Sequence, residues 1–176
     1  MTYDLPHYSP SVRDCCNERT ILLDGFSKAY AMTGWRLGWC VGPKEVIQKM
    51  GRVLQATVSC TPDFLQYGGI AALKGPQLTG KMMEEFTERR NILIAGLNSI
   101  PKLSCVMPQG AFYAFPTITK TGMTSAQFAD FALEKAGIAL LPGTAFGPGG
   151  EGYVRLSYAT KLDHIREAVE RLRSVL

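Results

Sequence analysis

Three side chains that could bind and activate a small molecule lie within one glycine-rich stretch, residues 25–39. Ser27 and Lys28 are adjacent, and Arg36 stands eight positions after the lysine. A lysine amine can condense with an aldehyde only when it is unprotonated, whereas a free lysine titrates at about 10.4. An arginine offers phosphate a planar, permanently charged fork, and a serine adds a hydroxyl donor. A Ser-Lys pair in a glycine-flanked turn is usually only a solvated turn, so the assignment depends on the whole stretch.

Two short apolar runs enclose this stretch and predict how the lysine is positioned. Residues 20–24 precede it and residues 37–41 end it, and short apolar runs bounded by glycine are typical of buried strands. We therefore expect a strand, a loop and a second strand, with the lysine where the first strand ends. A nucleophilic lysine has to be desolvated or placed beside positive charge, and Phe26 and Tyr30 flank Lys28 in a way that predicts desolvation.

The stretch from Gly25 to Trp39 resembles the lysine loop of fold-type I, pyridoxal-phosphate-dependent aminotransferases of class I/II, a group that includes aspartate, aromatic and kynurenine aminotransferases. It matches the family pattern Ser-Lys-x-aromatic-x-Met-x-Gly-x-Arg-x-Gly. The resemblance implies that Lys28 forms a Schiff base with pyridoxal 5'-phosphate and moves protons in catalysis, while Ser27 and Arg36 bind the phosphate. The family often has Ser or Thr three positions before the lysine, where this chain has Gly25, so one phosphate contact is expected to be missing.

Arg155 lies inside an apolar strand candidate, residues 153–158. Alternation places Val154 and Leu156 on one face of that strand and the arginine on the other. From the residues alone, an arginine on the polar face of an edge strand is the simpler interpretation. The resemblance implies instead that this Gly-x-x-Arg-aliphatic-Ser strand binds the α-carboxylate of the substrate through Arg155, a bidentate contact for which lysine is a poor replacement.

Two further segments match the same family. Residues 108–113 carry a glycine and aromatic residues that border the substrate entrance in the family, and residues 142–147 match its Pro-Gly-x-x-Phe-Gly turn. Gly110, Phe112 and Phe146 are therefore secondary candidates, because by sequence alone they are a turn residue and ordinary core aromatics.

The composition is that of a soluble globular protein. Of 176 residues, 46% are hydrophobic and 19% charged, and the net charge of +4 is scattered without a run of lysine or arginine. Nothing in this pattern supports a nucleic-acid partner, and no apolar segment reaches the ~18 residues that a membrane span requires. Five cysteines without C-x-x-C spacing argue against a disulfide framework or a zinc site and favour a cytoplasmic location.

Beyond the lysine stretch, the periodicity predicts three helices followed by a compact α+β unit. The helices are expected from Gly42-Pro43 onward, from Thr61 to Lys74 and from Leu78 to Asn98. The third one carries charged side chains that we expect on a solvated face: Glu84, Glu85, Glu88, Arg89 and Arg90. In the remainder, strands are expected at 103–107, 111–115, 138–141 and 153–158, and helices after capping boxes that begin at Thr124 and Thr160.

We predict an α/β fold, the C-terminal part of a fold-type I pyridoxal-phosphate transferase. Residues 1–77 would be the remnant of the large domain with the lysine loop, and residues 78–176 the small α+β domain including the interdomain helix. Residues 1–18 are rich in turn formers and are expected to be a connecting loop. The Asp-x-x-Tyr segment that the family carries a few residues upstream is not in the sequence, nor are its glycine-rich phosphate loop and its ring-stacking aromatic. We therefore expect a truncated chain that is inactive or weakly active alone.

The resemblance implies amino-group transfer between an amino acid and a 2-oxo acid, at an active site on a homodimer interface. Neither nucleic acid nor membrane is expected as a partner. Two alternatives remain open: another reaction of the same fold, as in its lyases and synthases, and a non-catalytic interaction module that keeps the motif. The preferred amino acid stays open as well, because Phe112, Tyr113 and Phe146 suit an apolar substrate but also occur in enzymes for acidic ones.

Overall fold

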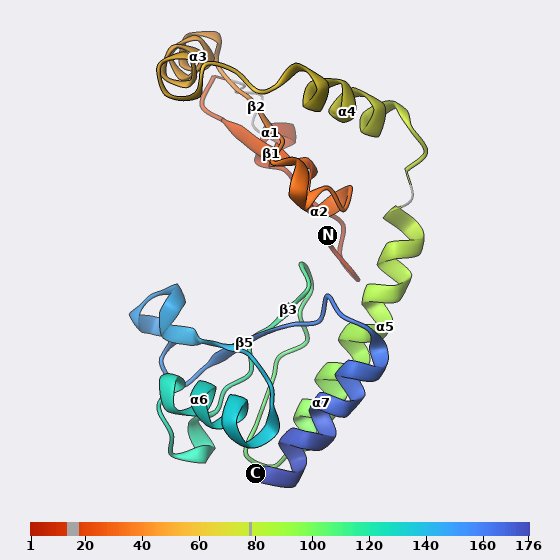
Figure 1. The fold of residues 1–176 in the computed structure, drawn as a ribbon, viewed down its shortest axis with the longest axis vertical. Helices are drawn as coiled ribbons and strands as arrows, with labels where there is room; N and C mark the ends of the chain where they lie inside the picture. The colour runs from red at the N-terminus through yellow and green to blue at the C-terminus, as the bar shows by residue number, and fades with distance from the viewer. Residues whose placement is uncertain (14–17, 78) are drawn as a thin grey trace. The chain divides into compact units, whose positions relative to one another are not determined.

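The computed structural model describes residues 1–13, 18–77 and 79–176, and these form two compact units (Figure 1). Pro6–Gly80 make up one unit, called here the lysine-loop unit. Met1–Leu5 and Lys81–Leu176 make up the other, called the sheet unit. The sequence placed the boundary between residues 77 and 78, and the structural division falls after Gly80 and adds the N-terminal residues to the sheet unit. The predicted helix start at Leu78, and Cys15 and Cys16, lie outside the described residues.

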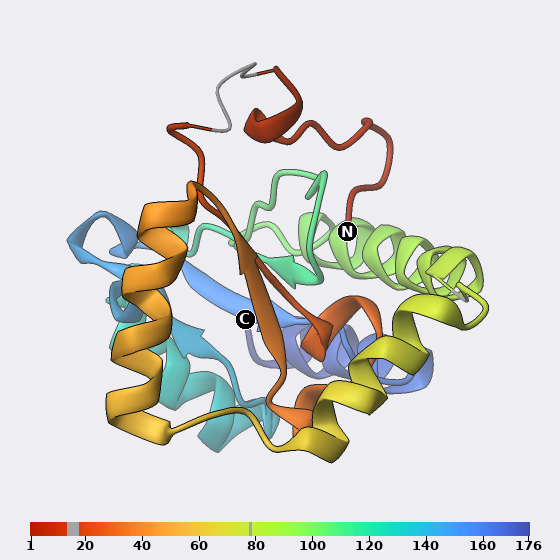
Figure 2. The same ribbon diagram turned by 90° about the horizontal axis from the view of Figure 1, so that it is seen from above.

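The lysine-loop unit is built on an antiparallel hairpin. Its elements, in which η denotes a short 3₁₀ helix, are α1 (Pro10–Arg13), β1 (Leu22–Gly25), α2 (Phe26–Ala29), η1 (Thr33–Trp35), β2 (Gly38–Val41), α3 (Lys44–Val58) and α4 (Asp63–Lys74). Strands β1 and β2 pair with each other, and the two longer helices follow them; Figure 2 shows α3 in orange and α4 in yellow beside the hairpin. The predicted order of strand, loop and strand is confirmed, as are both helices, but the expected burial of the strands is wrong, because neither strand has a buried residue. The lysine, however, lies on the short helix α2 and not at the strand end.

The two strands approach each other most closely at a pair of glycines. Gly25 lies opposite Gly38 in the register. A Cβ atom on Gly25 would lie 3.2 Å from the Leu37 carbonyl oxygen, and one on Gly38 would lie 3.0 Å from that of Asp24. Both neighbours are backbone atoms that cannot rotate away, so glycine at these two positions lets the hairpin close beneath the lysine loop.

Helix α4 fixes the loop through two further glycines. A Cβ atom on Gly69 would lie 2.7 Å from Leu37 Cδ2 and 3.2 Å from Phe26 Cζ. A Cβ atom on Gly68 would meet the Trp35 ring at 2.2 Å. The side chains of the loop therefore occupy the space that larger residues on α4 would need, and helix and loop pack as one piece.

The lysine-loop unit buries little of its own apolar surface. Among its described residues, Phe26 and Leu37 are the buried large hydrophobic side chains, and α3 has none. Large apolar side chains are exposed on both strands and on both long helices, including Leu23, Val41, Val53, Val58, Phe64 and Tyr67. A hairpin of two strands is marginally stable by itself, so this unit depends on its helices for what core it has.

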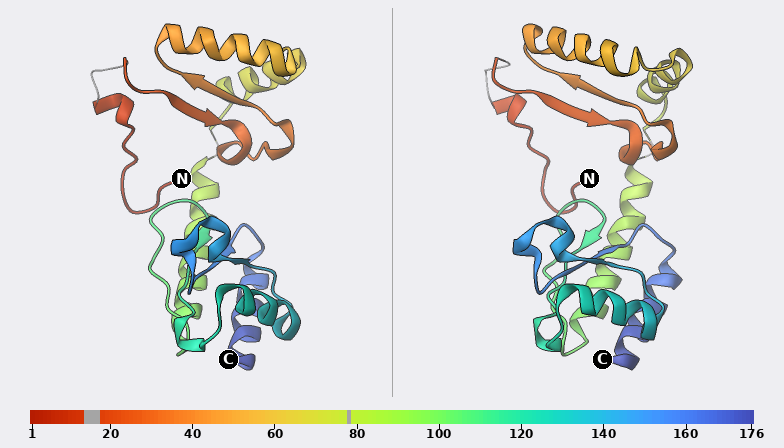
Figure 3. Two further views of the ribbon diagram at one scale, coloured as in Figure 1. Left: turned by 90° about the vertical axis from the view of Figure 1, so that its left-hand side faces the viewer. Right: turned by 60° about the vertical axis from the view of Figure 1, so that its left-hand side comes forward.

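The sheet unit contains a three-stranded antiparallel sheet and three helices. Its elements are α5 (Thr79–Asn98), β3 (Tyr113–Ala114), η2 (Thr119–Thr121), α6 (Ser125–Ala136), β4 (Leu141–Pro142), η3 (Gly143–Phe146), η4 (Pro148–Gly150), β5 (Val154–Ser157) and α7 (Leu162–Val175). The strand order is β3-β5-β4, so β5 is the central strand. Helices α5 and α7 run side by side (Figures 1 and 3), and Gly96 on α5 leaves room for Val169 on α7.

One hydrophobic core holds this unit together. It joins the last turns of α5 to the sheet, α6 and α7; its largest fully buried members include Ile94, Leu97, Ile118, Phe128, Val154, Tyr158 and Leu172. Of the helices in residues 1–13, 18–77 and 79–176, none combines the length and apolar character of a membrane span.

The two predicted capping boxes differ in outcome. Thr124 caps α6 through its side chain and Gln127 completes the box, as expected. Helix α7 has Lys161 at its N-cap position without a side-chain cap, so the prediction of Thr160 as the cap was wrong. The Thr160 hydroxyl instead lies 3.2 Å from His164 Nδ1, one turn into the helix.

The strand expected at residues 103–107 does not form, and only an isolated bridge joins Ser104 to Thr117. The physical reason is a side chain that takes the place of a neighbouring strand. Asn98 Nδ2 donates to the Cys105 carbonyl at 3.0 Å, and the Cys105 amide donates to Asn98 Oδ1 at 2.7 Å. An amide side chain thus satisfies the backbone groups that a β ladder would have used.

Candidate functional site

The lysine loop is held by the backbone of Phe26. Its amide donates to the Leu37 carbonyl at 3.1 Å, and its own carbonyl accepts from the amides of Tyr30 and Met32, each at 3.3 Å. The side chain of Phe26 is buried beneath these bonds. The loop is therefore anchored at its base, and the next two residues, Ser27 and Lys28, project from an ordered helical turn.

Lys28 is exposed, and Ser27 is half-buried. The expected desolvation of the lysine between Phe26 and Tyr30 is wrong for this structure, because the two aromatic rings pack on each other with their centres 5.2 Å apart. Neither ring shields the amine. No described residue forms an ion pair with Lys28, so its amine is open to a ligand.

Arg36 ends the same loop in an unusual backbone conformation. Its φ is 51° and its ψ 39°, the left-handed region that residues with a Cβ atom rarely occupy. The guanidinium Nη1 donates to the Thr33 carbonyl at 3.0 Å, one turn back. The Arg36 side chain is exposed, and no described carboxylate forms an ion pair with it. The N–H groups that do not contact Thr33 are therefore available to an anion.

Arg155 lies on the central strand of the sheet unit, which removes the alternative of an edge-strand arginine. The predicted alternation is confirmed, since Val154 and Leu156 are buried and Arg155 is only partly so. Its guanidinium carbon lies 4.3 Å from the centre of the Tyr113 ring and 4.4 Å from that of Phe146. No described carboxylate pairs with it. A cation between two rings, without an acid beside it, keeps its N–H groups available for an anion.

Further aromatic residues hold these two rings in place. Phe115 contacts Phe146 edge to face at 6.1 Å and stacks on Tyr153 at 5.4 Å, and Tyr113 contacts Phe112 at 4.6 Å. The matching segments indicated Phe112 and Phe146 as secondary candidates, but not Tyr113 as a contact of the arginine. The available signal was cross-strand pairing: Tyr113 lies opposite Ser157 in the register, which places it diagonally next to residue 155.

Two glycines of the matching segments, the secondary candidate Gly110 and Gly143 in the turn at residues 142–147, have clear structural roles. Gly110 pairs with Thr2 in an isolated bridge, and a Cβ atom there would lie 3.0 Å from the Met1 carbonyl. Gly143 packs against Gly150, where an added Cβ would lie 2.1 Å from the carbonyl oxygen. That contact closes the turn that presents the Phe146 ring to the arginine.

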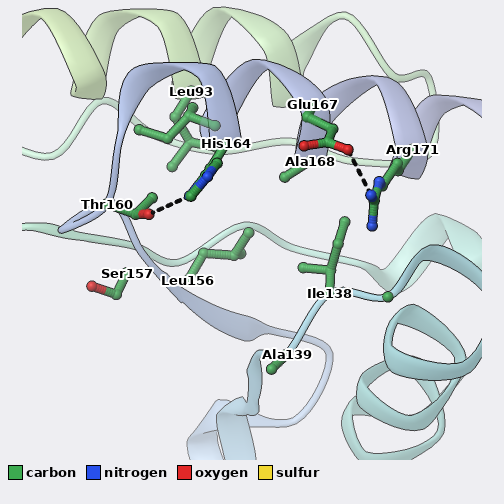
Figure 4. A pocket seen from close by; sticks show the side chains of 12 residues that line it. Leu93, Ile138, Ala139, Leu156, Ser157, Thr160, His164, Glu167, Ala168 and Arg171 are labelled. Carbon is green, nitrogen blue, oxygen red and sulfur yellow. Dashed lines mark hydrogen bonds and ion pairs between the residues drawn. The ribbon is translucent and has the colours of Figure 1, made fainter.

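A separate pocket of about 380 Å³ lies between α7 and the strands, lined by apolar side chains such as Leu156 and Ile165 (Figure 4). Its polar groups are satisfied by one another. Glu167 pairs with Arg171 at 2.6 Å, and Thr160 contacts His164. Neither Arg155 nor the Tyr113 and Phe146 rings that contact it line this pocket, so it is not part of the arginine site. Among the described residues, no group of acidic, histidine and cysteine side chains could hold a metal.

The structure thus brings Ser27, Lys28 and Arg36 together in one loop of the lysine-loop unit. It places Arg155 in the sheet unit, among aromatic rings. The first unit carries an exposed amine, a hydroxyl and a guanidinium in a single loop, and the second carries a guanidinium between two aromatic rings.

Comparison with known proteins identifies the class to which these features belong. The family described as aminotransferase class I and II matches residues 5–172. The chain is 43% identical to an aspartate aminotransferase of Pyrococcus abyssi, over 98% of this chain and 45% of that protein. It is 42% identical to aromatic-amino-acid aminotransferase 2 of Thermococcus litoralis, over 99% of this chain and 46% of that protein. The chain belongs to the class I and II aminotransferase family.

Solved structures agree. An aromatic aminotransferase from Pyrococcus horikoshii superposes with a TM-score of 0.96 at 43% identity, covering 99% of this chain and 48% of that chain. The predicted fold class, an α/β part of a fold-type I aminotransferase, is confirmed. The chain spans about half the length of the relatives it matches.

The aminotransferase family generally depends on pyridoxal phosphate, and the donor set of the lysine loop fits that group. The aldehyde requires an accessible amine, which Lys28 supplies. The phosphate requires a fixed cation and short donors, which Arg36 and Ser27 supply from the same loop. The residues present therefore fit the aldehyde and phosphate ends of the cofactor.

Proposed function

We propose that this chain carries the lysine and the carboxylate-binding arginine of an aminotransferase that moves an amino group between an amino acid and a 2-oxo acid with pyridoxal 5'-phosphate. The observation that carries the proposal is the accessible, unpaired Lys28 on a loop anchored by Phe26, in a chain of this family. Membership of the family supports the reaction class, and the accessible amine on an anchored loop supports Lys28 as the residue that binds the cofactor.

Each residue has a definite task in this proposal. Lys28 would hold the cofactor through its Nζ, and its amine, when free, would accept the proton that leaves the substrate α-carbon. Ser27 and Arg36 bind the phosphate and so fix the cofactor's position. Arg155 binds the α-carboxylate as a fork, which orients the C–H bond that is broken. When bound, the cofactor supplies the electron sink for the electron pair of that bond.

Several finer expectations from the sequence stay predictions. They are the homodimer, the cytoplasmic location and the weak activity of the chain alone. The exposed Lys28 amine agrees with the last of these, because nothing in its surroundings excludes water as an efficient site requires. The amino acid preferred and the choice between transfer and a lyase or synthase reaction remain to be measured.

The test is a pyridoxal phosphate titration of the purified chain, followed by borohydride reduction and peptide mass mapping. We expect a single labelled lysine, Lys28, and no label at that peptide in the Lys28→Ala variant. Lys49→Ala is the matched control, because Lys49 is an exposed lysine on α3 of the same unit. Weak labelling spread over several lysines would contradict the proposal and favour the non-catalytic interaction module.

A labelled chain can then be assayed for reaction class. Amino acid and 2-oxo acid pairs are added, and the amino acid that appears is measured. Transfer to the 2-oxo acid supports an aminotransferase, whereas loss of the substrate amino group without a new amino acid indicates one of the other reactions of the fold.

A further inference from the structure

The N-terminal residues of the sheet unit form a strap across the turn at residues 108–113. The Tyr3 amide donates to the Gln109 carbonyl at 3.1 Å, and the Ala111 amide donates to the Met1 carbonyl at 3.2 Å. An antiparallel bridge joins Thr2 to Gly110 between them. The segment expected to be part of a connecting loop is, at its start, a strand-like partner of this turn.

Arg90 contacts both the N-terminal strap and the turn. It was expected on a solvated helix face, and that expectation is wrong: its side chain is only 4% exposed. Nη1 donates to Asp4 Oδ2 at 2.8 Å and to the Pro108 carbonyl at 3.1 Å, and the guanidinium lies 4.3 Å from the centre of the Tyr3 ring. Burying an arginine costs free energy unless its charge is paired and its N–H groups are hydrogen-bonded. The contacts of Arg90 join two segments that lie far apart in the sequence.

Two tyrosines fix the middle of the same turn. The Tyr3 hydroxyl donates to the Ala111 carbonyl at 2.6 Å. The Tyr158 hydroxyl lies 3.0 Å from the Tyr3 hydroxyl and 3.2 Å from the same carbonyl, within hydrogen-bond distance of both. Ala111 has a φ of 59°, a strained value for a residue with a Cβ atom. Burial, followed by the hydrogen bond to Tyr3, raises the pKa of Tyr158. The neutral Tyr158 hydroxyl lies within hydrogen-bond distance of the carbonyl of this strained residue.

The clamped turn leads directly to the arginine site. The Phe112 carbonyl accepts from the Tyr158 amide at 3.0 Å, and the following residue is Tyr113, whose ring lies against Arg155. We propose that Arg90, with Asp4 and Tyr3, is a positioning residue that holds the Tyr113 ring against Arg155 and so pre-organises the carboxylate-binding fork. This inference rests on the proposed function of Arg155.

The physical reason is entropy. An arginine side chain has many rotamers, and binding a carboxylate as a fork requires one of them. A ring fixed at 4.3 Å restricts the guanidinium before the ligand arrives. If the strap is released, the turn before β3 loses a restraint and the Tyr113 ring, although still held by the pairing of β3 with β5, is fixed less firmly. Arg155 then becomes more mobile, and ordering it lowers the affinity for a carboxylate.

Nuclear magnetic resonance of the full chain tests this in two ways. The first readout is the ring-current shift of the Arg155 δ protons, assigned with the Arg155→Lys variant. The second is the affinity of Arg155 for 3-phenylpropanoate, a carboxylate probe, followed at the same signals. In Arg90→Met we expect the δ protons to move toward their unstructured position and the Kd to rise about three- to tenfold.

Asp4→Asn makes the test independent of a folding defect in Arg90→Met. The Asp4 side chain is 65% exposed, so its replacement leaves the core intact while it weakens the contact to Arg90. We expect the same changes with smaller size, about two- to threefold in Kd. Asp163→Asn is the matched control, since Asp163 is an exposed carboxylate paired with Arg166 on α7 of the same unit.

The two readouts separate the possible failures. If the probe binds at Arg155 and both variants bind it as the wild type does, the positioning role is overturned. If the ring-current shift responds to Arg90→Met but no chain binds the probe, the strap still orders Arg155 and the carboxylate role of the proposed function fails. If neither the shift nor the affinity differs from the Asp163→Asn control, Arg90 has only a structural role.

Discussion

The guanidinium of Arg155 lies 4.3 Å from the centre of the Tyr113 ring. This distance makes the tyrosine ring a direct determinant of how the arginine is oriented, because a cation over a ring face gains about 0.5–1 kcal/mol at a partly exposed site. Arg155 has no acidic partner among the described residues, so the rings of Tyr113 and Phe146 are its main restraints.

We predict that Tyr113→Leu weakens carboxylate binding and that Tyr113→Phe does not. Leucine fills space but has no ring face, so Arg155 loses a restraint and the Kd for 3-phenylpropanoate should rise about two- to fivefold, as expected for a contact of this size. Phenylalanine keeps the ring and serves as the control. Equal affinities in Tyr113→Leu and Tyr113→Phe, measured by the same titration, would show that the ring does not orient the arginine.

The lysine loop and the arginine strand could be recognised from the sequence because both are local patterns. Ser27, Lys28 and Arg36 lie in one stretch of ten positions between two apolar runs, and Arg155 alternates with buried neighbours in a single strand. Period and spacing predict such features directly. The helices were predictable for the same reason.

The contacts that hold the arginine site could not be predicted in this way. Tyr3 meets Tyr158 across 155 positions, and Arg90 meets Asp4 across 86. Helical spacing places Arg90 on the apolar stripe of α5, four positions after Phe86 and three before Leu93, whereas Arg89 lies off that stripe and pairs with Glu85. The spacing is therefore a signal for the burial of Arg90, but it does not name Asp4 and Pro108 as its partners. A charged side chain is rarely buried without partners, and those depend on the whole fold.

The packing of α4 on the lysine loop predicts opposite effects for two glycines. Gly69→Ala places a methyl group 2.7 Å from Leu37 Cδ2 and close to Phe26, both of which are buried, so the lysine-loop unit should lose about 1–3 kcal/mol of stability. Gly51 on α3 has no atom within 4 Å of an added Cβ, so Gly51→Ala should gain about 0.5–1 kcal/mol from better helix propensity.

Tryptophan fluorescence in denaturant measures both changes without interference from the sheet unit. The chain has two tryptophans, Trp35 and Trp39, and both belong to the lysine-loop unit. A midpoint for Gly69→Ala equal to or above that of the wild type would show that α4 does not press on the loop as the geometry indicates.

The turn beneath Phe146 makes a sharper prediction, because backbone atoms are the obstacle there. An added Cβ on Gly143 would lie 2.1 Å from the Gly150 carbonyl oxygen and 2.7 Å from that of Tyr153. Neither can rotate away, so Gly143→Ala should destabilise the sheet unit by about 3 kcal/mol or more. Gly149→Ala, six positions on in the same loop with open space at its Cβ, should cost far less. Amide hydrogen exchange of β5 measures both, and similar protection in the two variants would refute the close approach.

Glu151 provides a pH-dependent test of the start of α6. Its Oε1 accepts from the Ser125 amide at 2.8 Å, the Ser125 hydroxyl at 3.1 Å and the Gly152 amide at 3.0 Å. The hydrogen bonds from the backbone amides of Ser125 and Gly152 lower the pKa of Glu151 from its ordinary value of 4.5. The carboxylate thereby ties the loop before β5 to the first turn of α6.

The sign of the effect follows from which state binds the proton more tightly. Below 4.5 the unfolded chain takes up the Glu151 proton before the folded one does, so the contribution to stability is fully present above 4.5 and is lost as the pH falls through the lowered folded-state value. Glu151→Gln should therefore destabilise the sheet unit most at neutral pH, and its difference from the wild type should shrink as the solution is acidified. Glu134→Gln, at an exposed position near the far end of α6, is the control and should show no such convergence. Hydrogen exchange of the α6 amides at several pH values provides the measurement, and a constant difference between Glu151→Gln and wild type down to pH about 3 would mean that the carboxylate does not act through its charge.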